Sequence, residues 1–101
     1  GKNFKIKDEI FRFTSYSRDK LRVLMTVDPK VGKKKNGRED KDNAVSWIRE
    51  YGKGRVFYCS LGHNAAVFRN KAVLGHWLAG IQYVLGDLDA DATSLPQPKA
   101  Q

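Results

Sequence analysis

The chain has 101 residues and a formal net charge of +8, from 19 basic and 11 acidic side chains. Leu, Ile, Val and Phe together make up 25 of the 101 residues, above the roughly 20% below which chains tend to stay disordered. The apolar stretches are far shorter than the ~18 residues of a membrane-spanning helix, which excludes that class. One cysteine, Cys59, excludes an internal disulfide framework and any multi-cysteine metal site. We therefore expect one small domain, or part of one, with no cofactor.

Residues 1–43 carry 13 basic and 7 acidic side chains, residues 44–86 carry 5 and 1, and residues 87–101 carry 1 and 3. Within the first of these ranges, the polar segment 30–43 mixes lysines with acids and contains one apolar residue. A phosphate-binding surface is one interpretation, and a solvated, mobile loop between strands is the other. The loop is favoured because no aromatic residue accompanies these lysines, as stacking on bases would require. We therefore expect no specific nucleic-acid partner.

About four strands are expected, in chain order. The first is predicted near residues 9–13, and the second is the nearly continuous apolar run 21–27, typical of a strand buried on both faces. Residues 44–51 and 55–61 are the third and fourth strands. The Gly-Lys-Gly sequence at 52–54 predicts a tight turn between them, so this pair must be an antiparallel hairpin. Its apolar content predicts an interior position in the sheet.

A helix is predicted over residues 71–85. Asn70 is a suitable N-cap, and Gly86 stands where a left-handed C-terminal cap is expected. Residues 87–101 have the composition of a disordered tail or linker. Apolar residues within the helix recur at helical period, and we expect this stripe to pack on one face of the sheet. Its members are Leu74, Trp77, Leu78, Ile81, Val84 and Leu85.

These elements leave one side of the sheet uncovered. A single helix covers one face, whereas the strands at 21–27 and 55–61 are apolar on both faces. A bare second face would be an apolar patch of a size that soluble monomers rarely expose. We therefore expect the chain either to form a homo-oligomer or to associate with a missing N-terminal half of a larger α/β domain.

Five segments of the chain occur in a recognisable order. The most specific is 50–63, Glu-Tyr-Gly-Lys-Gly-Arg-Val-Phe-Tyr-Cys-Ser-Leu-Gly-His, and the others are 8–13, 16–24, 45–47 and 78–86. Together they resemble the trehalose-utilisation (ThuA-like) family, over about residues 8–86. The resemblance implies a partial ThuA-like domain over 1–86. It also implies a link to the metabolism of trehalose or a related sugar. The sugar would be the ligand.

The fold that this resemblance implies is an α/β, flavodoxin-like sandwich similar to that of class I glutamine amidotransferases. The chain corresponds to its C-terminal part, with about four strands, an antiparallel hairpin and one long C-terminal helix. In the amidotransferases a catalytic His-Pro-Glu follows the last hairpin strand, where Gly62-His63-Asn64 stands here. Position 65 is Ala rather than Glu, so His63 lacks the carboxylate that orients such a histidine. The cysteine nucleophile of that class belongs to the missing half.

Three functional hypotheses follow. The first is a segment of a sugar-metabolising ThuA-like domain that is inactive by itself. The second is a non-catalytic binding or interaction module on the same fold, which the missing Glu favours. The third, least favoured, is a nucleic-acid-binding module that uses the lysine segment.

Three residues are candidates for a sugar site at the carboxyl ends of the strands, where open α/β sheets bind ligands. His63 is the catalytic candidate because an imidazole exchanges protons near neutral pH. Asn64 could hydrogen-bond a sugar hydroxyl or cap the next turn. Asp28 ends the strand at 21–27; it could meet His63 if both strands run the same way, or belong to an ordinary Asp-Pro turn.

Four further residues are weighed against core roles. Cys59 lies mid-strand and is expected to be buried and inert. His76 flanks the apolar stripe, which favours helix packing over metal binding. Trp47 and Tyr58 could form a sugar-stacking platform, but the strand alternation favours a place in the core.

Overall fold

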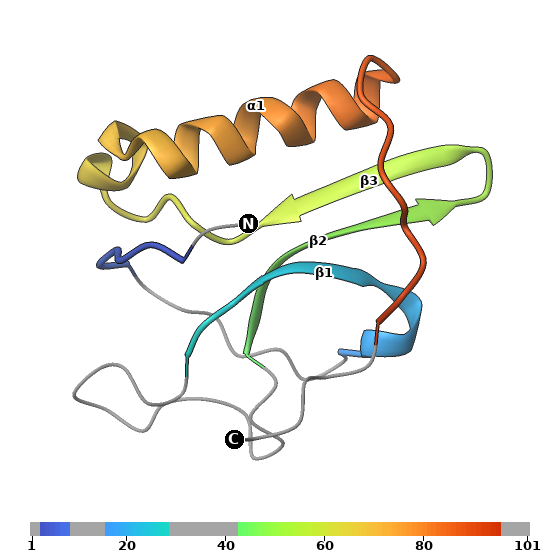
Figure 1. Ribbon diagram of the computed structural model, residues 1–101, viewed down its shortest axis with the longest axis horizontal. Helices are drawn as coiled ribbons and strands as arrows, with labels where there is room; N and C mark the ends of the chain where they lie inside the picture. The colour runs from blue at the N-terminus through green and yellow to red at the C-terminus, as the bar shows by residue number, and fades with distance from the viewer. Residues whose placement is uncertain (1–2, 9–15, 29–42, 96–101) are drawn as a thin grey trace.

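A computed structural model provides the structure and describes residues 3–8, 16–28 and 43–95. Within these ranges one α-helix, two short 3-10 helices and three strands make an α/β fold (Figure 1). In chain order they are η1 (Arg18–Lys20), β1 (Arg22–Thr26), β2 (Ala44–Tyr51), β3 (Gly54–Cys59), η2 (Ala65–Arg69) and α1 (Lys71–Leu85). No helix in these ranges has the length and apolar content needed to cross a membrane.

The three strands form one antiparallel sheet in the order β1-β2-β3. β2 and β3 are the predicted hairpin, which is confirmed: the pairing runs from Ser46 opposite Cys59 to Tyr51 opposite Gly54. β1 pairs antiparallel with the other side of β2, with register irregularities around Met25. β1 and β3 therefore run in the same direction on either side of β2.

The sheet differs from the prediction in strand count and in burial. The described residues contain three strands rather than four, and the strand expected near residues 9–13 lies outside the described residues. The segment 30–43 likewise lies outside them, apart from its last residue. β1 and β3, expected to be buried on both faces, are the edges of the described sheet and are only partly buried, whereas β2 is central and largely buried. The reason is that a β-branched composition indicates that a segment suits a pleated strand, but it does not indicate whether that strand lies at the centre or at the edge of the sheet.

The predicted bounds and both caps of α1 are confirmed. The Asn70 side chain accepts hydrogen bonds from the backbone N–H groups of Ala72 and Val73, at 2.9 and 3.3 Å. Gly86 ends the helix in the left-handed conformation, with φ of 85°. These bonds satisfy backbone groups that a helix terminus otherwise leaves without a partner. The helix lies over the face of the sheet on the β3 side (Figure 1).

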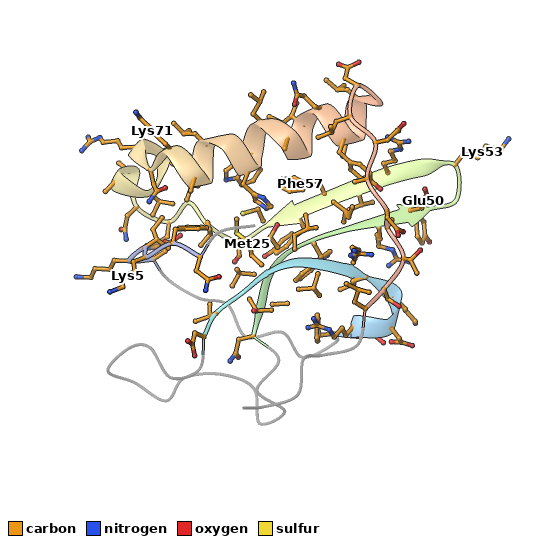
Figure 2. All side chains as sticks on the ribbon, in the orientation of Figure 1. Lys5, Met25, Glu50, Lys53, Phe57 and Lys71 are labelled. Atoms are coloured by element: carbon orange, nitrogen blue, oxygen red, sulfur yellow. The ribbon has the colours of Figure 1, made fainter. Side chains whose placement is uncertain are left out.

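The face that α1 turns to the sheet is not the predicted one. Its buried residues are Val73, Gly80 and Tyr83, and Phe57 lies between α1 and β3 (Figure 2). Of the predicted stripe only Trp77 packs inward; the exposed members are Leu74, Leu78, Ile81, Val84 and Leu85. The reason is the close approach at Gly80, where the Phe57 ring occupies the space that a side chain would fill. The predicted stripe was chosen from the periodicity of large apolar residues, and a glycine does not contribute to that pattern.

The core lies beneath the N-terminal part of α1. Cys59, Leu61, Val67 and Val73 are its buried members, and partly buried apolar side chains pack against them: Phe4, Ile6, Met25, Phe57 and Trp77. The predicted burial of Cys59 is confirmed, and this burial raises the pKa of its thiol. A buried thiol with a raised pKa is a poor nucleophile.

Residues 87–95 run from the end of α1 across the strands to η1 (Figure 1). Arg55 Nη2 lies 2.9 Å from Asp89 Oδ1, and Arg22 Nη1 donates to the Thr93 carbonyl at 2.9 Å. Arg18 Nε donates to the Leu95 carbonyl at 3.0 Å. The disordered tail predicted over 87–101 stays a prediction as a whole, and residues 96–101 lie outside the described residues.

The contact at Gly80 predicts opposite effects of the same substitution at two glycines of α1. A Cβ at Gly80 would overlap three ring carbons of Phe57, whereas one at Gly75 would meet no atom within 4 Å. Gly80→Ala should lower the free energy of unfolding by about 1–3 kcal/mol, as overpacking does. Gly75→Ala should raise it by up to about 1 kcal/mol, because Ala favours helix. Urea unfolding of both variants tests this, and equal shifts of the two midpoints would contradict the close approach.

Candidate functional site

The loop that follows β3 carries two of the three residues predicted for a sugar site. His63 and Asn64 lie between β3 and η2, and both are exposed. Asn64 is the N-cap of η2, yet its side chain makes no capping hydrogen bond within the described part of the chain; its backbone carbonyl accepts from the Val67 N–H at 3.0 Å. The Asn64 amide is therefore not used as the cap that was the alternative to a sugar contact.

Asp8, which the sequence analysis did not single out, holds this loop. Its Oδ2 accepts a hydrogen bond from the Gly62 N–H at 2.7 Å, and its Oδ1 accepts from the His63 N–H at 3.2 Å. Hydrogen bonds to an ionised carboxylate are stronger than neutral ones. These two bonds go to the backbone, so Asp8 sets the position of the loop. Its signal in the sequence was its place at the start of the segment 8–13, which belongs to the ThuA-like resemblance.

Gly62 fixes the loop from the other side. Its φ is 139°, a conformation that side-chain-bearing residues rarely adopt, and a Cβ there would lie 2.6 Å from Phe68 Cζ. The backbone before His63 therefore packs directly on the aromatic ring from η2. Asp8 and Phe68 thus both contact the backbone that leads to the imidazole.

Asp28 lies two residues beyond the end of β1 and is exposed. β1 and β3 run in the same direction, which was the condition for Asp28 and His63 to meet. The two residues therefore lie beyond the same end of the strands. β2 stands between their strands, which separates the two backbones by about two strand spacings, roughly 10 Å. The structure thus brings His63 and Asn64 together in one loop and places Asp28 across the central strand from them.

A buried polar pair lies beneath α1. The hydroxyl of Ser46, on β2, donates to the Tyr58 carbonyl at 2.7 Å, and its Oγ lies 2.6 Å from His76 Nε2. Because the hydroxyl proton goes to the carbonyl, the second bond requires His76 Nε2–H as donor. Burial lowers the pKa of His76, which favours the neutral ring. His76 is therefore a packing residue with one satisfied ring nitrogen, in line with the predicted helix-packing role.

Trp47 and Tyr58 stack on each other, with ring centroids 4.4 Å apart and planes 22° apart. They alternate with the helix-facing pairs of the hairpin, so they lie on the face of the sheet away from α1. Both are partly buried, and Tyr16 packs against Trp47 at 5.9 Å. One face of each stacked ring is thus already covered, which favours the packing role over a sugar platform.

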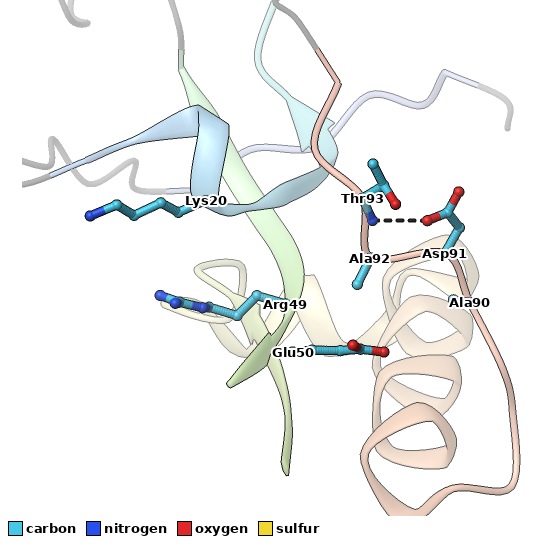
Figure 3. Close-up of a pocket in the computed structure, with 7 residues that line it drawn as sticks. All are labelled: Lys20, Arg49, Glu50, Ala90, Asp91, Ala92 and Thr93. Carbon is cyan, nitrogen blue, oxygen red and sulfur yellow. Dashed lines mark hydrogen bonds between the residues drawn. The ribbon is translucent and has the colours of Figure 1, made fainter. Parts of the chain in front are cut away.

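A hollow of about 300 Å³ lies at the opposite end of the strands, near the hairpin turn (Figure 3). Its lining is formed by Lys20, Arg49, Glu50, Ala90, Asp91, Ala92 and Thr93. The two basic and two acidic side chains balance, so the lining favours neither an anion nor a cation. Among the described residues, no three His, Cys, Asp or Glu side chains gather as a metal site would require.

The comparison with known families identifies the chain. A family model named ThuA, described as trehalose utilisation, matches residues 1–84. The chain belongs to the ThuA family. The match includes the Asp8 contact, the whole hairpin and nearly all of α1. No curated protein and no solved structure matches the chain.

The contact of Asp8 with the loop predicts the effect of removing its charge. Asp8→Asn should cost about 1–3 kcal/mol of stability, because charge-assisted hydrogen bonds are replaced by a weaker one. The amides of Gly62 and His63 should exchange with solvent faster relative to those in the middle of β3. Glu50→Gln, an exposed site near the hairpin turn, is the matched control. Unchanged exchange at 62 and 63 in Asp8→Asn would show that another contact holds the loop.

Burial of His76 predicts a loss of stability on mild acidification. Its pKa is lowered in the folded ThuA domain, whereas in the unfolded chain it is near 6.5. Below about pH 6.5 the unfolded state therefore binds more protons, and the free energy of unfolding falls as pH decreases toward the folded-state value. Above about pH 7 this contribution is constant. His76→Gln, which keeps an N–H donor, should remove this part of the dependence of the free energy of unfolding on pH. The free energy of unfolding of both proteins should be measured between pH 5.5 and 7.5, and an equal dependence on pH would contradict the prediction.

Proposed function

We propose that this ThuA domain acts in the metabolism of trehalose or a related sugar, and that the loop between β3 and η2 forms part of the sugar site. The observation that carries the proposal is the way Asp8 fixes the backbone of Gly62 and His63. The side chains of His63 and Asn64 stay exposed on this fixed backbone. A binding site needs this combination of a rigid backbone and accessible polar groups.

The chemistry of these side chains suits sugar hydroxyls. The Asn64 amide offers both donors and an acceptor, and the imidazole of His63 can do the same with its two nitrogens. Asp28, beyond the same end of the strands, adds a carboxylate that can accept hydrogen bonds from sugar hydroxyls. His63 is the residue that would exchange a proton in a reaction, since it is the histidine exposed on this loop.

We infer further that the segment is the C-terminal part of a flavodoxin-like, amidotransferase-like sandwich and that its site is completed by an N-terminal half. The partly buried edge strands of the described sheet support this. On this view the segment alone binds sugar weakly and does not catalyse. Cys59 does not supply a nucleophile, because it is buried and its thiol pKa is raised.

A non-catalytic binding module on the same fold is the alternative. It is favoured by Ala65, which stands where an orienting Glu would be expected. The two functions share the sugar contact and differ in turnover. A protein that contains both halves, binds trehalose and converts no sugar would support the alternative.

A titration with trehalose, followed by amide chemical shifts, tests the sugar site. Shifts should move for residues 62–64 and for the His63 ring, with a dissociation constant in the millimolar range, as expected for part of a site. His63→Ala and Asn64→Ala should each weaken binding severalfold, while Lys53→Ala at the hairpin turn should not. The proposal fails if trehalose moves only the signals of the hollow near Lys20, or if sorbitol produces the same shifts as trehalose.

A further inference from the structure

The outer face of α1 carries an apolar seam formed by Leu74, Leu78, Ile81 and Leu85. These side chains are between 47% and 70% exposed. Their spacing of four, three and four residues is that of a helix that packs along a second helix, where apolar residues recur every 3.5 positions. Side chains project from α1 away from the sheet (Figure 2). The inner face of α1 packs on the hairpin, and the seam lies exposed on the opposite face.

The charged residues that flank α1 along the chain have signs opposite to those its dipole favours, although Arg55 of β3 partly offsets this at the C-terminal end, where it donates to the Tyr83 carbonyl at 3.2 Å and pairs with Asp89. Arg69 and Lys71 stand at its N-terminal end, and Asp87 and Asp89 follow its C-terminal end. The N-terminal end of a helix favours acidic side chains and the C-terminal end favours basic ones. The first turn of α1 has no acid and the last turn no base. An antiparallel neighbouring helix of the same sequence would bring each basic end beside an acidic end and correct this arrangement.

The seam and the charges share one centre. Lys71 and Asp87 lie eight positions before and after Ala79, and the four seam residues are distributed about the same point. A twofold axis there makes the face complementary to itself, as an isologous dimer requires. Each Lys71 would meet the Asp87 of the other copy.

We propose that the seam is a homodimer interface in which two copies of α1 pack antiparallel about a twofold axis near Ala79. A patch of this kind covers roughly 300–600 Å², less than the about 800 Å² per partner of a standard stable interface. Interfaces of this size are typical of weak, transient association, so we expect monomer and dimer to exchange at micromolar concentrations. This inference does not depend on the proposed sugar site.

Sedimentation equilibrium of the full chain, from low micromolar to submillimolar concentration, tests the dimer. The chain should shift from monomer to dimer without larger species. Leu78→Glu, at the centre of the seam, should raise the dissociation constant at least tenfold, since interface energy concentrates in central residues. Leu24→Glu is the matched control: Leu24 is 43% exposed on β1, away from α1, and its variant should dimerise normally. Circular dichroism confirms that each variant is folded.

A charge exchange tests the antiparallel orientation. Lys71→Glu should weaken the dimer roughly fivefold or more, because two attractive pairs become repulsive. Adding Asp87→Lys should restore it, since each pair is then attractive again. Parallel helices would place like residues together, and the double variant would then not recover.

Three results would overturn the proposal. The chain could stay monomeric at all concentrations, as expected if another segment of a longer protein covers the seam. Leu24→Glu could abolish the dimer while Leu78→Glu leaves it intact. The double charge variant could dimerise no better than Lys71→Glu, which decides the question even if Leu78→Glu does not fold.

Discussion

The close approach of α1 to β3 at Gly80 decides how the other parts of this ThuA domain are arranged. The Phe57 ring fills the space beside Gly80, and His76 and Trp77 pack around the same ring with centroids 5.2 and 5.5 Å away. Once this face of the helix is turned inward, His76 reaches Ser46 and the apolar seam faces outward. A single steric contact thus links the hairpin, the buried polar pair and the proposed dimer face.

The two ends of the sheet have different properties. At one end the loop after β3 is held by a carboxylate on one side and an aromatic ring on the other, while its polar side chains stay exposed. At the other end the chain after α1 is tied to the strands by arginines, and the hollow there has balanced charge. The fixed, exposed loop is the better candidate for ligand recognition because a preorganised group loses less entropy on binding.

The proposed dimer and the proposed sugar site lie on different parts of the domain. The seam is on the outer surface of α1, whereas His63 and Asn64 lie in the loop beyond the end of β3. A substitution at Leu78 therefore tests association without touching the loop, and one at His63 tests the loop without touching the seam. In a longer ThuA protein the two surfaces could serve assembly and chemistry separately.

The sequence by itself determined the hairpin, the bounds of α1, the burial of Cys59 and the place of His63 after β3. These features depend on residues a few positions apart: a glycine turn between apolar strands, an Asn cap, a glycine stop and strand alternation. Only the tertiary structure decided which face of α1 is buried, which strand is central and which residue holds the site loop. Both apolar faces of α1 have helical periodicity, and the choice between them depends on the fit of Gly80 to a ring 23 positions earlier. Asp8 likewise meets Gly62 across 54 positions, a distance over which local pattern carries no information.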